Sequence, residues 1–184
     1  MEKKKKNILE LTNCTLEEYH DLHKLPIAVM ADNVRSAQNI GAMLRTADAF
    51  LIGEFIMAGI SATPPSAEIS KTALGAEQSV SWRHVEDALA EAEAMQRDGW
   101  MVCVLEQTHN SVDLRRLPLQ RDAMRQRRGV LLVVGNEVHG VNQQIADMAD
   151  LTIEIPMHGT KHSLNVSTSA GIAMWELYKL LGDA

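Results

Sequence analysis

The chain has 184 residues, of which 46% are hydrophobic, enough to form one domain of ordinary size around a buried core. Its formal net charge of −6 argues against unspecific binding of polyanions, because phosphate contacts require lysine and arginine side chains clustered on a surface. Cys14 and Cys103 stand far apart with no CxxC pair, so the sequence predicts neither a disulfide framework nor a cysteine-built zinc site.

Residues 1–24 are interpreted as a short N-terminal extension of a single domain that covers residues 25–184. The extension carries a lysine run, Lys3–Lys6, and no apolar segment of a signal peptide follows it. No stretch of the chain approaches the roughly 18 apolar residues that a membrane span requires. We therefore expect a cytoplasmic protein without a membrane segment, and the role of the lysine run stays open.

Short apolar runs alternate with helical patterns along the domain. This alternation is typical of an α/β fold with a mainly parallel sheet flanked by helices. The expected strands are Ile27–Met30, Glu54–Ala58, Met101–Leu105, Val130–Val134 and Leu151–Ile155.

Three amphipathic helices are expected between and after these strands. The first begins between Ser36 and Asn39, and Arg45 lies off its apolar face. The second ends at Gly99, and the last ends at Gly182 with an apolar seam that faces either the core or a partner. The apolar positions are Ile40, Met43, Leu44 and Ala47 in the first helix, Val85, Ala88, Leu89 and Ala92 in the second, and Val166, Ala170, Ala173, Leu177 and Leu180 in the last.

The segment Arg115–Arg128 concentrates positive charge. It holds six arginines against one acid, Asp122, so its local charge is six minus one, or +5. Arginine without lysine favours bidentate phosphate contacts, whereas the alternative is a solvated, charged loop. Its role is left open between these two interpretations.

Polar residues and glycines gather in three segments at predicted strand ends, where open α/β sheets bind their ligands. The segments are Asn33–Asp48, Gly135–Val141 and Ile155–Ser169. Each has a structural alternative: Asn39 as a helix N-cap with Arg45 as a solvated arginine, a glycine turn without function, and capping side chains at the start of the last helix. His158 and His162 are four residues apart, but Gly159 lies between them and no HExxH pattern is present, so no metal site is expected.

Taken together, the three segments resemble the signature motifs of the SPOUT superfamily, in the branch of TrmH-type tRNA and rRNA 2′-O-ribose methyltransferases. The residues that carry the resemblance run from Asn33 to Phe50, from Gly135 to Gly140, and from Ile155 through Ser167. The resemblance implies a deep C-terminal trefoil knot, a homodimer, S-adenosyl-L-methionine as the cofactor, and structured RNA as the substrate. It covers the chain from about Leu25 to Leu181.

The resemblance also implies a role for nine residues. Arg45 is expected to clamp the phosphate next to the reacting ribose, because a guanidinium with a pKa above about 12 is a poor base. Asn39 would orient Arg45 or the ribose, and Glu137 would fix the turn of the second motif. Ser163 and Asn165 would shape the cofactor and ribose site, and the residues expected to contact the cofactor are Leu105, Gly135, Ile155 and Leu164.

One position departs from the family pattern: Leu51 follows the first motif, where the family often has glycine, so that turn is expected to differ. Two other functions remain as alternatives, a SPOUT methyltransferase that acts on a base nitrogen and a catalytically silent RNA-binding module. Whether the RNA is tRNA or rRNA, which nucleotide is modified, and whether a partner protein takes part in recognition are not determined by the sequence.

Overall fold

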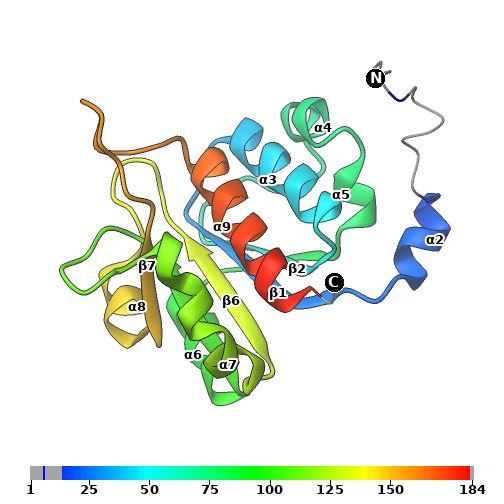
Figure 1. Ribbon diagram of the computed structural model, residues 1–184. Coiled ribbons are helices and arrows are strands. Elements are labelled where there is room, and N and C mark those ends of the chain that lie inside the picture. Colours follow the sequence, from blue (N-terminus) through cyan, green and yellow to red (C-terminus); the bar gives the residue numbers. More distant parts are fainter. Residues whose placement is uncertain (1–5, 7–13, 183–184) are drawn as a thin grey trace, which may run out of the picture.

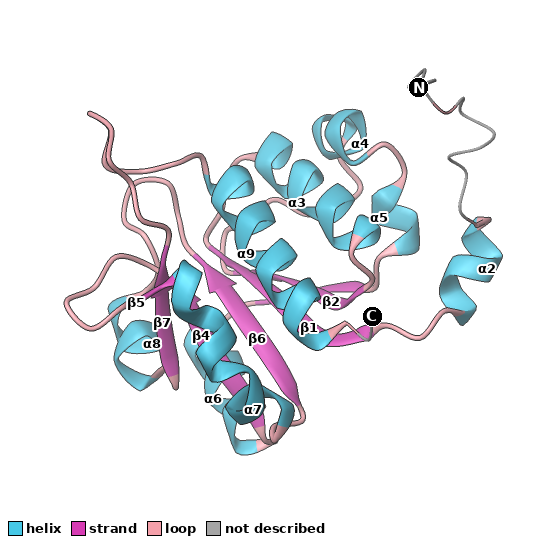
Figure 2. Ribbon diagram, viewed as in Figure 1, coloured by secondary structure: helices cyan, strands magenta, loops and turns pink. Residues whose placement is uncertain are grey.

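The computed structural model describes residue 6 and residues 14–182. A seven-stranded sheet forms its centre, in the order β3-β2-β1-β6-β4-β7-β5, and all of its strand pairs are parallel (Figure 2). This confirms the expected α/β class, whereas the threading of a knot stays a prediction. The strands are β1 (Leu25–Asp32), β2 (Ile52–Ala58), β3 (Trp82–Val85), β4 (Trp100–Leu105), β5 (Val112–Asp113), β6 (Gly129–Val134) and β7 (Leu151–Glu154).

The five expected strands form, with ends that differ from the prediction by at most two residues. The two edge strands, β3 and β5, were not expected, because they are short and carry polar residues. Val85 was assigned to a helix, and this was wrong: it ends β3 and pairs with Ala58 of β2. The helix begins only at Ala88, after Asp87, whose side chain accepts a hydrogen bond from the Ala90 amide at 3.0 Å.

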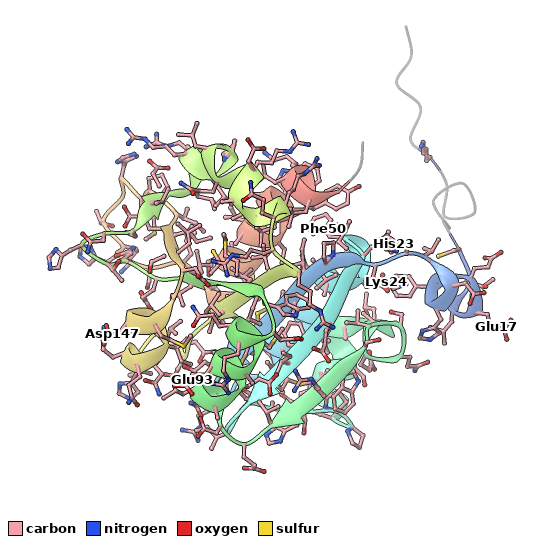
Figure 3. All side chains as sticks on the ribbon, turned by 90° about the horizontal axis from the view of Figure 1, so that it is seen from below. Glu17, His23, Lys24, Phe50, Glu93 and Asp147 are labelled. Carbon is pink, nitrogen blue, oxygen red and sulfur yellow. The ribbon has the colours of Figure 1, made fainter. Side chains whose placement is uncertain are left out.

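Helices cover both faces of the sheet (Figure 1). Alternate residues of β1 point to opposite faces, so that Ile27 and Val29 belong to one buried core and Ala28 and Met30 to the other. In Figure 3, Glu93 of α6 and Asp147 of α8 lie on one side and Phe50, at the end of α3, on the other. The first side holds α6 (Ala88–Arg97) and α8 (Gln143–Met148), and the second holds α3 (Ala37–Ala49), α4 (Ala67–Ala73), α5 (Ala76–Ser79), the 3₁₀ helix η1 (Leu114–Gln120), α7 (Arg121–Arg125) and α9 (Val166–Leu181).

Helix α3 begins with Ser36, whose side chain accepts a hydrogen bond from the Asn39 amide at 3.3 Å. Ser36 is therefore the N-cap, and the alternative that Asn39 serves only as the N-cap is wrong. A Cβ atom on Gly41 would lie 2.1 Å from Thr72 Oγ1 and 2.4 Å from the Ile69 carbonyl oxygen. This glycine thus allows α3 and α4 to pack closely.

The turn after α3 contains Leu51 in a left-handed conformation, with φ at +52°. This is a region that glycine enters without strain and that a bulky residue seldom adopts. The Leu51 carbonyl accepts a hydrogen bond from the Leu25 amide at 2.8 Å, which fixes the turn against the start of β1.

The apolar seam of α9 faces the core of the chain itself, where Val166, Ala170, Ala173, Leu177 and Leu180 are all buried. Helix α9 lies beside α3 in Figure 1. A different set of α9 side chains remains exposed, namely Ile172, Trp175 and Tyr178. The surface that a partner could cover is therefore this second stripe.

The short helix α2 (Leu16–Asp21) lies within the expected N-terminal extension. Its Tyr19 is buried, and the Tyr19 hydroxyl donates a hydrogen bond to the Asp48 carbonyl at 3.3 Å, which ties α2 to the end of α3. Lys3–Lys5, most of the lysine run, lie outside the described residues. Across residues 14–182 and residue 6, no helix is long and apolar enough to span a membrane.

Most arginines of the Arg115–Arg128 segment have partners within the chain. Arg115 pairs with Asp113, Arg127 with Asp150 at 3.0 Å, and Arg128 with Asp98. Arg121 and Arg125 both donate to the Leu180 carbonyl, at 3.2 and 3.3 Å, and so cap the carboxyl end of α9. The structure thus uses much of this positive charge to hold η1, α7 and α9 in place.

Candidate functional site

A cavity of about 680 Å³ opens at the carboxyl ends of β4, β6 and β7, and we call it the strand-end pocket. Its volume lies in the range of about 300–1,000 Å³ that is usual for small-molecule sites. The structure places seven of the nine expected site residues in its wall: Leu105, Gly135, Glu137, Ile155, Ser163, Leu164 and Asn165. Segments far apart in the sequence therefore form one site, and Asn39 and Arg45 do not line it.

The loop after β6 folds tightly back on itself. Asn136 and Gly140 exchange two backbone hydrogen bonds, at 3.1 and 2.9 Å. A Cβ atom on Gly135 would lie 2.1 Å from both the carbonyl carbon of Gly140 and the amide nitrogen of Val141. Gly135 is thus required for this backbone approach, which closes one side of the strand-end pocket.

The side chain that holds this turn is that of Asn136, and not Glu137 as expected. Asn136 Oδ1 accepts from the amides of Val138 and His139, at 2.8 and 3.2 Å, and its Nδ2 donates to the Asn33 carbonyl at 2.8 Å. The Glu137 carboxylate points away from the turn and reaches α3 instead.

Asp32, which sequence reasoning missed, and Asn33, which it placed in the first polar segment without a role of its own, attach the same loop to the end of β1. Asp32 is 2% exposed, and its carboxylate accepts from the Asn142 amide and from Asn33 Nδ2, both at 2.8 Å. Asn33 adopts a left-handed conformation, with φ at +56°, and its Oδ1 accepts from the Ile60 amide at 3.1 Å. A polar pair directly after an apolar strand is the signal that could have identified them.

Glu106 and Gln107, at the end of β4, connect the loops on the opposite side of the pocket. Glu106 accepts from the Val141 amide at 3.2 Å, and Gln107 Nε2 donates to the His162 carbonyl at 3.0 Å. The loop after β6 and the loop before α9 are therefore both fixed to β4.

A chain of amide and carboxylate contacts joins the three polar segments. Asn39 Nδ2 donates to Glu137 Oε1 at 2.7 Å, and Asn165 Nδ2 donates to Asn39 Oδ1 at 3.0 Å. Asn165 Oδ1 also accepts from the Ser167 and Thr168 amides, so Asn165 caps α9 while it bonds to α3. Capping and site formation are thus performed by one residue.

Arg45 lies about one and two-thirds turns beyond Asn39 on α3 and is exposed. Six residues correspond to about 9 Å along a helix and to a different side of it, which explains why Asn39 contacts Glu137 and Asn165 rather than Arg45. Within the described part of the chain, the Arg45 guanidinium makes no hydrogen bond or ion pair. Its donors are therefore available to a group outside this chain.

The charge around the strand-end pocket favours a neutral or cationic ligand. Three carboxylates line it, those of Glu106, Glu137 and Glu154, and its described lining includes no lysine or arginine. Such a wall disfavours a polyphosphate and suits a sulfonium and an ammonium group. Leu105, Ile155 and other apolar side chains of the lining could cover a flat aromatic ring. S-adenosyl-L-methionine has both kinds of group, so the residues present fit it.

His158 and His162 do not form a metal centre with their neighbours. Over the described residues, no three histidine, cysteine, aspartate or glutamate side chains come together as metal ligands would.

Comparison with known proteins identifies the family of the chain. A model of the SpoU rRNA methylase family matches residues 26–175. The chain is 29% identical over 170 residues to a tRNA (guanosine(18)-2′-O)-methyltransferase of Aquifex aeolicus, covering 92% of this chain and 76% of that protein. It is 30% identical over 169 residues to a 23S rRNA (guanosine-2′-O-)-methyltransferase of Vibrio cholerae, covering 91% of this chain and 64% of that protein.

Solved structures show the same fold. The crystal structure of the A. aeolicus TrmH/SpoU tRNA modifying enzyme matches with a TM-score of 0.74 at 27% identity, over 90% of this chain and 81% of that one. An AdoMet-bound rRNA methyltransferase from Sinorhizobium meliloti matches with a TM-score of 0.74 at 26% identity, over 88% of this chain and 59% of that one.

Proposed function

The chain belongs to the SpoU rRNA methylase family, as the three motifs indicated, and on that basis we propose that it transfers a methyl group from S-adenosyl-L-methionine to a ribose 2′-hydroxyl of tRNA or rRNA. The observation that carries this proposal is the strand-end pocket, in which the second and third motifs meet beside the Asn165–Asn39–Glu137 chain. The relatives that it resembles act on both kinds of RNA, so the substrate is proposed as structured RNA in the cytoplasm.

The cofactor is held by the walls of the strand-end pocket. Leu105, Ile155 and Leu164 supply apolar contact, and the close approach at Gly135 brings backbone groups to the ligand. When bound, the cofactor would supply a methyl group on a sulfonium sulfur; its transfer to the 2′ oxygen would leave the thioether S-adenosylhomocysteine, and the hydroxyl proton would pass to solvent. Glu106 and Glu137 favour the positive charge of the donor before transfer.

Asn39, Glu137, Ser163 and Asn165 orient the acceptor ribose. The first, second and fourth are bonded to each other, so their side chains are held in place before RNA binds. The Ser163 hydroxyl lines the pocket and makes no hydrogen bond within the described residues, so it can bond to the ligand or to the ribose. The remaining amide protons of Asn39 and Asn165 and the Ser163 hydroxyl are preorganised donors, which stabilise charge that develops on the attacking oxygen, whereas the Glu137 carboxylate acts only as the acceptor that orients Asn39.

Arg45 binds the phosphate next to the acceptor ribose and stabilises the developing alkoxide. A planar guanidinium binds phosphate in a bidentate manner and keeps its proton near neutral pH. Because Arg45 is outside the strand-end pocket of its own chain, we assign it to the pocket of a second subunit.

A homodimer is supported by the exposed stripe of α9. Trp175 and Tyr178 stack at 5.6 Å between ring centroids, and Phe50 at the end of α3 lies 5.5 and 5.3 Å from them. Trp175 is 45% exposed, and an exposed cluster of aromatic rings is typical of a subunit interface. Light scattering should give twice the mass of the 20.3 kDa chain, and Trp175→Asp should give a monomer.

Comparison of RNA from a strain that lacks the gene with RNA from its parent tests the function. Mass spectrometry of the nucleosides should show the loss of one 2′-O-methylated species. Loss of a base-methylated nucleoside instead would establish the base methyltransferase. An unchanged set, together with RNA binding by the purified protein, would establish the silent RNA-binding module.

A further inference from the structure

A second hollow, of about 520 Å³, lies on the other side of the loop after β6, and we call it the outer pocket. Residues 136–139 line both this pocket and the strand-end pocket, so a single loop separates the two. The outer pocket alone is lined by Arg35, Ser36 and Ile60, which come from the loops after β1 and β2.

Two aliphatic side chains of the outer pocket are unusually exposed. Ile60 is 65% exposed and Val138 is 80% exposed, although both lie in well-fixed loops. The Ile60 amide is bonded to Asn33 Oδ1 at 3.1 Å, and the Val138 amide to Asn136 Oδ1 at 2.8 Å. Because these hydrogen bonds fix the backbone at both positions, the two side chains stay exposed, and they provide apolar surface for a flat ring.

Arg35 gives the outer pocket a positive charge that the strand-end pocket lacks. It is exposed, and over residue 6 and residues 14–182 its guanidinium makes no hydrogen bond or ion pair. An unpaired guanidinium beside a hollow is suited to a phosphate, which it binds with two parallel hydrogen bonds.

We propose that the outer pocket binds the acceptor nucleotide of the RNA, with the base against Ile60 and Val138 and one of the two flanking phosphates on Arg35, the other being the phosphate assigned to Arg45. This inference rests on the proposed function, because in-line transfer requires the ribose to lie beside the methyl donor. With the donor in the strand-end pocket, the neighbouring hollow is where the rest of the nucleotide fits. The ribose then lies at the shared loop, next to Glu137 and its partner Asn39.

The salt dependence of RNA binding tests the phosphate contact without relying on catalysis. Filter binding would use total tRNA and rRNA from the deletion strain, with protein saturated with S-adenosylhomocysteine. For Arg35→Ala, the slope of log affinity against log salt should become shallower by about 0.7–0.9, the value for one lost phosphate contact. The matched control is Arg97→Ala, an exposed arginine on α6 that pairs with Glu93, and it should keep the wild-type slope.

Steady-state kinetics with the methyl-accepting RNA test the base contact. Arg35→Ala should raise the KM for RNA about tenfold, and Ile60→Ala about threefold, with the KM for S-adenosyl-L-methionine unchanged and kcat within about threefold. Because Ile60 is largely exposed, its truncation leaves no core cavity. Ile60→Phe, which enlarges the surface for a base, should keep or lower the KM for RNA.

Three results would overturn the proposal. If Arg35→Ala binds RNA with the same affinity and salt slope as Arg97→Ala, then Arg35 makes no phosphate contact. A rise in the KM for S-adenosyl-L-methionine as large as the rise in the KM for RNA would show that the outer pocket is part of the cofactor site. Dissociation of the dimer by Ile60→Asp would show that a second subunit covers it. If the wild-type protein binds RNA but transfers no methyl group, the proposed function fails, while the salt slope still decides whether Arg35 binds phosphate.

Discussion

The arginines of this protein fall into two regions with opposite structural circumstances. In the segment Arg115–Arg128, five of the six have partners within the chain: carboxylates for Arg115, Arg127 and Arg128, and the Leu180 carbonyl for Arg121 and Arg125. At the first motif, Arg35 and Arg45 are exposed and make no such contact in the described residues.

The contrast shows that a high local density of arginines does not by itself leave their guanidinium groups available for phosphate. A guanidinium that already bonds to a carboxylate loses much of its capacity for phosphate, whereas an unpaired one keeps its donors. The dense segment therefore serves mainly the packing of η1, α7 and α9, and we propose that the two isolated arginines bind the substrate. The predictions below follow this division, in order of decreasing effect.

Arg45→Ala should lower the rate of methyl transfer by at least about a hundredfold, as expected when a preorganised charge is removed from a transition state. Its fold and its affinity for S-adenosyl-L-methionine should be unchanged, because Arg45 is exposed and fills no part of the core. Single-turnover kinetics and calorimetry measure the two quantities. Arg127→Ala is the control from the dense segment and should stay within about threefold of the wild-type rate. A near-normal rate of methyl transfer in Arg45→Ala would contradict the role assigned to Arg45.

Arg45→Lys distinguishes two roles of Arg45, a phosphate clamp and a general base. A lysine keeps the positive charge and loses the bidentate geometry, so a phosphate clamp should retain about a tenth of the activity with little new dependence on pH. An arginine that acted as the base would behave differently: the lysine variant should become faster as the pH rises towards about 10. A pH profile of the single-turnover rate distinguishes these outcomes, and a rising profile would refute the clamp.

Replacement of Arg121 and Arg125 together by alanine should reduce the free energy of unfolding by about 1–3 kcal/mol, because the Leu180 carbonyl loses two charged donors. The rate of methyl transfer at 25 °C should change little. Denaturant unfolding followed by tryptophan fluorescence measures the first effect. If transfer falls as far as in Arg45→Ala while stability is unaffected, the dense segment binds substrate and the division between the two regions is wrong.

Arg115→Ala should have the smallest effect, which is a change in the pKa of one carboxyl group, that of Asp113. The side-chain hydrogen bond from Arg115 lowers the pKa of Asp113 to about 2. The pair therefore stabilises the folded state above the ordinary pKa near 4 and loses this contribution as the pH falls through about 2. NMR titration of the variant should give an Asp113 pKa above that of the wild-type protein but still below the ordinary value, because the backbone amide of residue 115 keeps its hydrogen bond to Asp113, and transfer at neutral pH should be unchanged. A pKa that stays near 2 would assign the shift to other groups.

The sequence predicted the central strands and the long helices well, because their apolar positions follow the periods of two and 3.6 that burial imposes. It failed at the edges of the sheet. Trp82–Val85 and Val112–Asp113 become strands only through pairing with β2 and β7, a tertiary effect without a local signal.

For the site, the motifs identified most of the lining but not what fixes it. Leu105, Gly135 and Leu164 were assigned to the cofactor through the resemblance, and the structure brings them into one wall. Asp32 and Asn136 were missed because their importance lies in contacts to residues more than a hundred positions away. Such contacts depend on how the loops cross, which periodicity cannot show.

The most direct test of the central claim is the position of the transferred methyl group. The purified protein would be incubated with S-adenosyl-L-methionine labelled in the methyl group and with RNA from the deletion strain, and the RNA would then be hydrolysed with alkali. Alkaline cleavage requires a free 2′-hydroxyl, so a 2′-O-methylated nucleotide survives within a dinucleotide. We predict that the label is recovered in alkali-resistant dinucleotides. Label recovered in mononucleotides would place the methyl group on a base and contradict the account.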